Sequence, residues 1–414
     1  MINIPSTNTL LQRMAIVDGD RRVAVFAGST SLVKLDLLFD NGTALQPQAL
    51  CAGAACKLMT VATERMNVQE LAEFLDFRGV VVEQGLTTTQ SSLTVYMLRR
   101  CADEVLPVVA DMVSCPAFAE DDYLVWQRAR RQELSTLEKR TSHVARRMFY
   151  ETLFGKEHPL GRYASVGDVD RLSLDTVRDF WRQHYGLKQC DIVLSGSVDD
   201  EMLALTAKCF GPRIGEAQPL LLPLPQQDGA GCRLEQKMES ATQTSIRIGR
   251  VLPLRWDEPD YARLMLLVTA LGGYFGSRLM SNLREDKGFT YGVRANTQLF
   301  SGVIVFCITA DVAAGSADAA VQETMKELRR LAEEPIGEEE LQLVKTVLAG
   351  DFLRSVDGVF ELSTRYCDMV GTGIDERLTD NMRSAIKETT AVQLQELAQR
   401  LLQEDSMTVC LAGV

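Results

Sequence analysis

Residues Ser31–Phe39 read SLVKLDLLF, and residues Gln243–Val251, which begin 212 positions later, read QTSIRIGRV. Both stretches alternate apolar and polar side chains, a pattern typical of a β-strand with one buried face. A segment with helical spacing of its apolar residues follows each of them, at Gln48–Ala62 and at Pro259–Ser281. The sequence therefore contains the same strand-then-helix unit twice.

The remainder of the two halves continues this correspondence. In each half we expect a second strand, a helix rich in acidic and aliphatic residues, and a closing helix and strand. In the first half these are Ser92–Leu98, Asp103–Val113, Ser173–Gln183 and Cys190–Gly196, and in the second half they are Val303–Thr309, Gly315–Ala332, Thr390–Leu402 and Met407–Gly413. We predict an α+β protein of two similar domains from an internal duplication, each a mixed or antiparallel sheet covered by helices on one face.

The stretch densest in proline and glycine lies almost at the midpoint of the 414 residues, at Gly211–Gly231 (GPRIGEAQPLLLPLPQQDGAG). Such a composition is typical of a linker. We therefore predict an N-terminal domain at residues 1–210, a linker at 211–231 and a C-terminal domain at 232–414, each domain having the usual size for one core.

The composition is that of a folded protein, with 46% hydrophobic and 24% charged residues. The formal net charge of −12 repels a phosphate backbone, so we expect no nucleic-acid partner. Apolar runs such as Leu220–Leu224 are far shorter than the ~20 residues of a membrane span, so we expect no membrane partner. The N-terminal stretch lacks the apolar core of a signal peptide, and the ten cysteines form no C-x-x-C pair. Both features favour the cytoplasm.

Two stretches carry side chains suited to binding. Lys156–Arg162 reads KEHPLGR, and its His-Pro-Leu-Gly is typical of a turn. Leu271–Val293 reads LGGYFGSRLMSNLREDKGFTYGV and predicts a helix, a turn at Asp286–Gly288 and a strand. Arg284 and Tyr291 flank that turn, where a guanidinium and a phenol can together hold a peptide carbonyl or carboxylate. On these residues alone, the pattern favours an Arg284 paired with a nearby acid and a Tyr291 packed in a core.

Four stretches together resemble the pitrilysin/insulinase family of zinc metallopeptidases (peptidase M16-like): KEHPLGR, SGSVD at Ser195–Asp199, LGGYFGSRL and LREDKGFTYGV. The likeness is in particular to the half-length, processing-peptidase-like members, and it runs from about residue 20 to the end, duplication included. It implies that Arg284 and Tyr291 match the family's Arg-Tyr pair, which reaches across to a substrate peptide bound on the zinc-bearing side.

Active members of that family carry an inverted zinc motif, H-x-x-E-H, on the first long helix of the first half. In this chain, Ala62-Thr63 and Glu70-Leu71-Ala72 resemble the sequence that follows the motif in the family. This match places the motif on Gly53–Lys57, GAACK. Gly53 and Lys57 then stand at the two histidine positions and Cys56 at the position of the catalytic glutamate. Glu133 matches the position of the third ligand.

These replacements remove the ligands of a zinc ion. Glycine has no side chain, a lysine ammonium repels the ion, and a thiol is a poor general base for zinc-bound water. The histidines of the chain, His143, His158 and His184, all follow Glu133, so they cannot restore the motif. We expect no cofactor in this chain and a vestigial ligand position at Glu133. The basic run beside it (Arg128, Arg130 and Arg131) fits a solvated helix face.

The resemblance implies a non-catalytic subunit of a heterodimeric zinc metallopeptidase, which helps to form a peptide-binding chamber. Its partners would be a homologous subunit that carries the zinc motif and the zinc, and a peptide substrate. The alternative is a pseudo-peptidase that binds peptides, or acts as a scaffold, as a homodimer. An independent peptidase is the least favoured reading, because it requires ligands that the sequence lacks.

Overall fold

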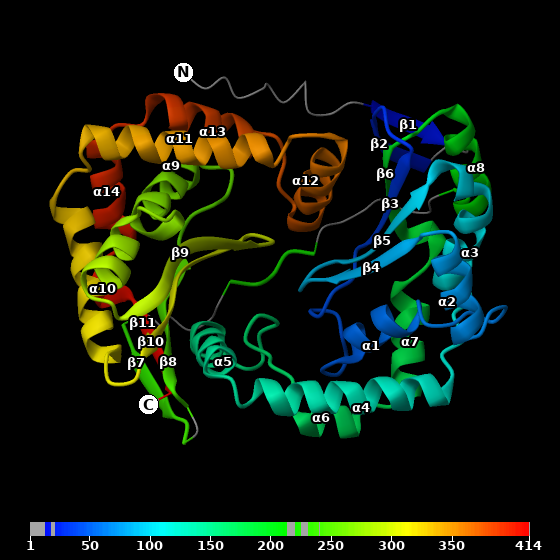
Figure 1. Cartoon of the computed structure of the whole chain (residues 1–414), viewed down its shortest axis with the longest axis horizontal. Helices are drawn as coiled ribbons and strands as arrows, with labels where there is room; N and C mark the ends of the chain where they lie inside the picture. Colours follow the sequence, from blue (N-terminus) through cyan, green and yellow to red (C-terminus); the bar gives the residue numbers. More distant parts are fainter. Residues whose placement is uncertain (1–12, 18–20, 213–219, 225–230, 240, 414) are drawn as a thin grey trace.

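The computed structural model describes residues 13–17, 21–212, 220–224, 231–239 and 241–413. Two β-sheets lie on opposite sides of the molecule, each with helices outside it (Figure 1). The first sheet has the strand order β1-β2-β6-β3-β5-β4, and the second has the order β7-β11-β8-β10-β9. The strands are β1 Arg13–Val17, β2 Arg21–Ala27, β3 Leu32–Phe39, β4 Val81–Leu86, β5 Ser91–Leu98, β6 Cys190–Gly196, β7 Arg233–Lys237, β8 Gln243–Leu252, β9 Thr290–Phe300, β10 Val303–Ala313 and β11 Thr408–Gly413.

The two sheets are copies of one another apart from the extra edge strand β1. In the first sheet β2 is parallel to β6, and the remaining neighbours β6-β3-β5-β4 are antiparallel. In the second sheet β7 is parallel to β11, and β11-β8-β10-β9 are antiparallel in the same way. The predicted duplication and mixed sheets are confirmed.

The helices also recur in the same order along both halves, except that α8 has no counterpart among the described residues of the second half. In the first half they are α1 Cys51–Leu58, α2 Val68–Phe77, α3 Ala102–Ser114, α4 Glu120–Leu137, α5 Thr141–Phe154, α6 Val166–Arg171, α7 Leu174–His184 and α8 Asp200–Phe210. In the second half they are α9 Pro259–Val268, the wide-turn segments η4 Thr269–Gly273 and η5 Met280–Asp286, α10 Ala317–Glu333, α11 Glu338–Arg354, α12 Val359–Thr372, α13 Arg377–Glu388 and α14 Ala391–Leu401. No helix in these described ranges is long and apolar enough to cross a bilayer.

Two predicted helices are shorter than expected. The helix expected at 48–62 begins only at Cys51, because Leu50 takes a left-handed backbone conformation with a φ of 73°. The helix expected at 259–281 breaks at Gly272, where a side-chain carbon would lie 2.6 Å from the backbone nitrogen of Ala295 on β9. Glycine therefore lets this segment turn away directly against the sheet.

Most of the predicted linker at Gly211–Gly231 lies outside the described residues, and the domain boundaries at 210 and 232 stay predictions. Of the part that is described, Leu222 is buried beside β10. The carbonyl oxygen of Pro223 lies 2.9 Å from Nε2 of His158. KEHPLGR forms the predicted turn, in which the backbone of Gly161 donates to the carbonyl of His158 at 2.9 Å.

Each sheet packs its own helices on one face and one helix of the other half on the opposite face. Helix α5 of the first half lies against β8, β10 and β11, through Phe149, Tyr150 and Val144. Helix α12 of the second half lies against β2, β3 and β6, through side chains such as Val359 and Tyr366. The two halves thus exchange helices, a feature that the sequence analysis did not predict.

A buried ion pair anchors α12 to the first sheet. Nζ of Lys34 lies 3.1 Å from Oδ2 of Asp36, and the two side chains are 3% and 4% exposed. The same ammonium donates to the hydroxyls of Thr364 at 2.9 Å and Ser363 at 3.3 Å on α12. Thr94 of β5 donates to the other oxygen of Asp36 at 2.7 Å. The exchanged helix is therefore held by polar contacts as well as by apolar packing.

We predict that Lys34→Ala lowers the free energy of unfolding by about 3–5 kcal/mol, because it leaves the carboxylate of Asp36 buried without a cation. Urea unfolding followed by circular dichroism measures the change. The double variant Lys34→Met/Asp36→Leu should recover most of the loss, and Lys57→Ala, at an exposed position of α1, is the control. A loss from Lys34→Ala no larger than that of the control would contradict the anchoring role.

Candidate functional site

The turn between η5 and β9 is built as the sequence predicts. Segment η5 ends at Asp286 with Lys287 as its C-cap, and Gly288 follows in a left-handed conformation with a φ of 64°. The backbone of Phe289 then donates to the carbonyl of Leu283 at 2.9 Å, which closes the turn, and β9 begins at the next residue. Arg284 and Tyr291 therefore stand on either side of this turn.

A β-bulge sets the position of Tyr291. The pairing of β10 with β9 runs from Ala310 opposite Val293 to Val312 opposite Thr290, so Tyr291 and Gly292 together lie opposite the single residue Asp311. The hydroxyl of Thr290 lies 2.6 Å from the carbonyl oxygen of Asp311 and accepts the backbone N–H of Gly292 at 3.1 Å. Bulges turn side chains away from the regular alternation. Tyr291 is 89% exposed as a result and does not pack in a core.

Arg284 is half-buried, and its guanidinium carbon lies 4.7 Å from the ring centre of Phe275, which is itself exposed. This cation–π contact orients the side chain without neutralising its charge. Within the described part of the chain, Arg284 makes no ion pair. The reading in which Arg284 pairs with a nearby acid is therefore not realised.

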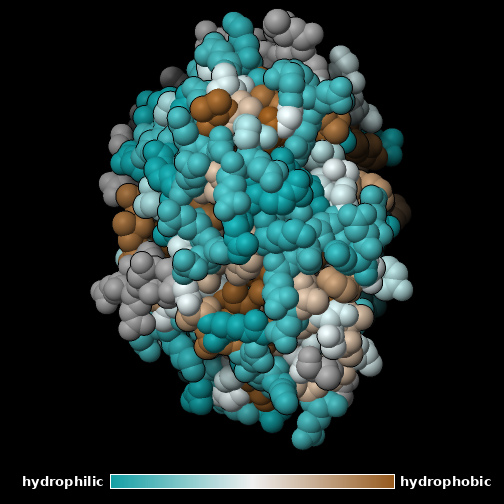
Figure 2. All heavy atoms as spheres, turned by 90° about the vertical axis from the view of Figure 1, so that its left-hand side faces the viewer, coloured by the Kyte–Doolittle hydropathy of each residue, from teal (hydrophilic) through white to brown (hydrophobic). Residues whose placement is uncertain are grey.

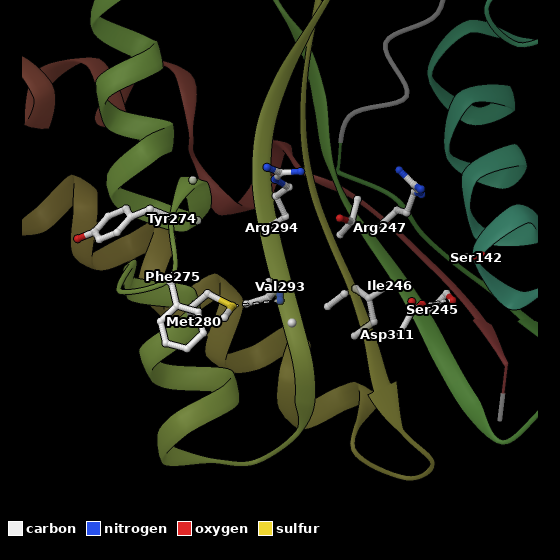
Figure 3. A pocket seen from close by; sticks show the side chains of 15 residues that line it. Ser142, Ser245, Ile246, Arg247, Tyr274, Phe275, Met280, Val293, Arg294 and Asp311 are labelled. Carbon is white, nitrogen blue, oxygen red and sulfur yellow. Dashed lines mark hydrogen bonds between the residues drawn. The ribbon is translucent and has the colours of Figure 1, made fainter. Parts of the chain in front are cut away.

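A pocket of about 490 Å³ opens beside this pair (Figure 3). The inner strands of the second sheet and the chain around Gly272 form its walls, and Ser142 at the start of α5 brings in the first half. Its lining includes Phe275, on whose ring Arg284 stacks, and Gly292, the residue after Tyr291. The candidate Arg-Tyr pair therefore stands at the margin of a concave site made by both halves.

The lining also contains polar residues that the sequence analysis did not single out, Arg247 and Arg294 among them. The sequence offers only a weak indication that these arginines face a pocket. Arg247 is a polar position of the alternating stretch QTSIRIGRV, but alternation shows only that a side chain avoids the core, and not that it faces a pocket.

The residues at the motif positions of α1 divide between two faces. Gly53 is half-buried and Lys57 is exposed, so these positions lie on the open side of the helix. A side-chain carbon at Gly53 would contact Leu86 of β4 at 3.7 Å, which places this position beside the edge strand of the first sheet. Cys56 points inward and is buried. The open face of α1 therefore presents the ammonium of Lys57 and the backbone of Gly53 to a ligand.

The thiol of Cys56 is held in its neutral form. Its Sγ lies 3.8 Å from the carbonyl oxygen of Gly85. Burial raises the pKa of Cys56 to about 11, and the hydrogen bond with Tyr185 and the charge of Lys57 lower that pKa only in part. A thiol in this state is neither a thiolate ligand nor a base at neutral pH.

Glu133 lies on α4, half exposed, and its carboxylate accepts from the guanidinium of Arg130 at 2.7 Å. Arg131 in the same run pairs with Asp170. The basic run thus behaves as a solvated helix face with ion pairs, as one of its readings predicts. Across the residues that the structure describes, no group of three or more His, Cys, Asp or Glu side chains is arranged to hold a metal ion.

Residues 171–348 match the family model described as the peptidase M16 inactive domain. An uncharacterized zinc protease of Mycobacterium leprae is 25% identical over 362 residues, which cover 86% of this chain and 81% of the relative.

Two solved structures share the fold. The peptidase M16 inactive domain from Pseudomonas fluorescens superposes with a TM-score of 0.83 at 20% identity, covering 97% of this chain and 98% of that chain. The periplasmic protease PqqL from Escherichia coli gives a TM-score of 0.76 at 14% identity. This match covers 100% of this chain and 47% of the longer PqqL chain.

We predict that Cys56 resists alkylation in the native protein, because burial raises the pKa of its thiol to about 11. Cys51 of the same helix should resist equally, since burial raises its pKa to about 12. Treatment with iodoacetamide at pH 8, followed by peptide mass spectrometry, measures the modified fraction of each cysteine. The same treatment in urea is the control and should label both. Rapid labelling of Cys56 in the folded chain would contradict the buried environment.

Proposed function

We propose, from the match of residues 171–348 to the inactive domain of the M16 peptidases, that this chain is the non-catalytic subunit of a two-chain zinc peptidase. In this proposal a homologous partner carries the zinc motif and the zinc, and the present chain supplies Arg284 and Tyr291 to the peptide held between them. The chain alone is then inactive, and its own zinc motif is degenerate.

The donor set of α1 does not fit zinc. A zinc site needs three protein side chains with lone pairs, and here Gly53 offers none, Lys57 carries a positive charge, and Cys56 is buried as a neutral thiol. Glu133 is already paired with Arg130. One carboxylate cannot hold a catalytic metal, so no step of a reaction is assigned to these residues.

The observation that carries the proposal is that half-buried Arg284 and exposed Tyr291 stand beside an open pocket. Among the described residues the guanidinium of Arg284 has no carboxylate partner, and Tyr291 is 89% exposed and does not pack in a core, so both groups are available to a ligand. They suit a peptide carbonyl oxygen that gains negative charge, to which the guanidinium donates a fork of hydrogen bonds and the phenol a single one.

Two further observations support a paired arrangement. The chain matches slightly less than half of PqqL, so one chain of that protease is long enough for two such units. The edge strands β4 and β9 lie toward the middle of the molecule, and an edge strand has free backbone groups to which an extended peptide can pair (Figure 1).

A cytoplasmic location belongs to the same proposal, because the sequence has no C-x-x-C pair and no disulfide joins cysteines among the described residues. The alternative, a homodimer that binds peptides without cutting them or acts as a scaffold, keeps the same pocket and dispenses with the zinc partner. Purification from the native host separates the two readings: a co-purifying chain with H-x-x-E-H supports the heterodimer, and a self-associated chain that brings no such partner supports the homodimer.

We predict that the purified chain, after dialysis, contains no stoichiometric zinc, because the side chains at the motif positions cannot bind it. Inductively coupled plasma mass spectrometry of the dialysed protein measures the metal content. Glu133→Ala is the informative variant, since it should change nothing. About one zinc per chain that disappears in Glu133→Ala would show that the degenerate motif still binds metal.

We predict that Arg284→Ala and Tyr291→Phe each lower the peptidase rate of the reconstituted pair by roughly 100-fold to 1000-fold, the usual cost of losing one such donor. Cleavage of an unfolded peptide gives the rate, and size-exclusion chromatography confirms that the pair still assembles.

Arg354→Ala is the control for these variants, because Arg354 is exposed and pairs only with Asp351 on its own helix. It should leave the rate unchanged. Full activity of a correctly assembled Arg284 or Tyr291 variant would show that these side chains do not act on the substrate.

A further inference from the structure

The pocket contains a row of side chains that runs straight across three strands. Thr309 of β10 lies opposite Arg247 of β8 on one side and opposite Arg294 of β9 on the other. Neighbouring strands are about 4.8 Å apart, and residues directly opposite one another share a face of the sheet. All three residues line the pocket, and Figure 3 shows both arginines extending to the same side of the sheet.

Neither arginine has a counter-ion in the described part of the chain. Arg247 has a sulfur contact, with one guanidinium nitrogen 3.8 Å from Sγ of Cys307, and no ion pair is formed by Arg294. Arginines elsewhere, such as Arg278 with Glu340 and Arg329 with Glu404, pair with acids within 3 Å. Two guanidinium groups without a counter-ion among the described residues therefore line one pocket, in a chain of net charge −12.

The nearest candidate for a counter-ion has another role. Asp311 supplies the carboxylate of the pocket lining, and one of its oxygens accepts from the hydroxyl of Ser245, the residue directly opposite it. Ser245 in turn contacts the hydroxyl of Thr141 on α5 at 2.8 Å. Asp311 is therefore tied to the contact between the halves, one row away from the arginines.

The duplicated sheet shows what this row would contain if it were structural. The corresponding row of the first sheet is Asp36, Thr94 and Glu83, with Thr94 again in the middle. In that sheet the same chain supplies the counter-ion: Lys34 neutralises Asp36, and α12 covers the pair. Ser245 stands at the position equivalent to Lys34, so the second sheet has a row of the opposite charge and no ion pair to neutralise it.

The N-terminal end of α5 adds to the positive electrostatic potential of the pocket. Ser142, in the first turn of α5, lines the pocket. That turn contains no acidic residue, and no side chain caps it, so the positive end of the helix dipole is not offset locally. The arginine row and the helix start therefore both favour a negative group in the pocket.

We propose that Arg247 and Arg294, with Thr309 between them, form a subsite that binds a carboxylate of a peptide lying in this pocket. The inference rests on the proposed function and narrows its substrate class to peptides with an acidic group. On β9, Arg294 is three positions from Tyr291, or about 10 Å at the rise of an extended strand. The carboxylate therefore belongs about three residues from the peptide bond that Arg284 and Tyr291 contact, as an acidic side chain or as the chain terminus.

The test measures the affinity of the full chain, without any partner, for four fluorescent peptides of one unfolded sequence. One has an aspartate and a C-terminal amide, one has asparagine and a free C-terminal carboxylate, one has both acids, and one has neither. Fluorescence anisotropy should show that at least one singly acidic peptide binds roughly tenfold more tightly than the neutral peptide, the scale of a charged hydrogen bond. The arm that gains affinity identifies the source of the carboxylate.

Arg247→Gln and Arg294→Gln should each remove this preference and leave the affinity for the neutral peptide unchanged. Arg250→Gln is the matched control, because Arg250 lies on the same strand but outside the pocket lining. Thermal unfolding confirms that all variants fold. Equal affinity of the wild-type chain for acidic and neutral peptides, binding of neither, or a preference that survives both pocket variants would overturn the subsite.

Failure of the proposed function gives a different result. If Arg284 and Tyr291 have no role in a two-chain peptidase, their variants keep full cleavage rates, while the carboxylate preference of the isolated chain and its loss in Arg247→Gln are unaffected. The two proposals can therefore fail separately.

Discussion

The exchange of α5 and α12 between the two halves is the constraint on which the other features depend. Each sheet presents apolar side chains on both faces, and its own helices cover one of them. The second face of each is covered by a helix that the other half supplies. Separating the halves would expose both of these faces to water, at roughly 25 cal/mol for each Å² of apolar surface. The halves are therefore expected to be stable only together.

That exchange also determines where a binding site can form. Helix α5 covers β8 and β11 and reaches the far end of β9 through Tyr150, but it leaves the ends of β9 and β10 near the bulge open, and its first turn becomes part of the pocket wall. In the first sheet, α12 instead seals the row that contains Asp36, with Ser363 and Thr364 bonded to Lys34. One duplicated fold thus has a closed polar row on one side and an open polar row on the other. The difference arises from a few side chains and not from topology.

The sequence was sufficient to predict strands and duplication, because alternation over eight or nine residues is a local property that both copies retain. Long-range features were not accessible in this way. Helices α5 and α12 have apolar faces like those of any amphipathic helix, and nothing in 141–154 or 359–372 says which sheet covers them. The bulge at Tyr291 depends on the register of β9 against Asp311, which only the paired strands define. The sequence therefore singled out Arg284 and Tyr291 as candidates, but the exposure of their side chains was not predictable from it.

Under the proposed function, the side chains at the motif positions of α1 stabilise the fold because they no longer have to bind zinc. Position 56 faces the core beside Tyr185, where an ionised glutamate without a metal and two histidines beside it would pay a large desolvation cost. A neutral thiol fits there without that cost. The same helix has glycine against Leu86 and lysine in solvent, so neither position needs a partner. If a partner supplies the zinc, packing alone selects these side chains, while the opposite half presents half-buried Arg284 and exposed Tyr291 beside the open row of β8, β10 and β9.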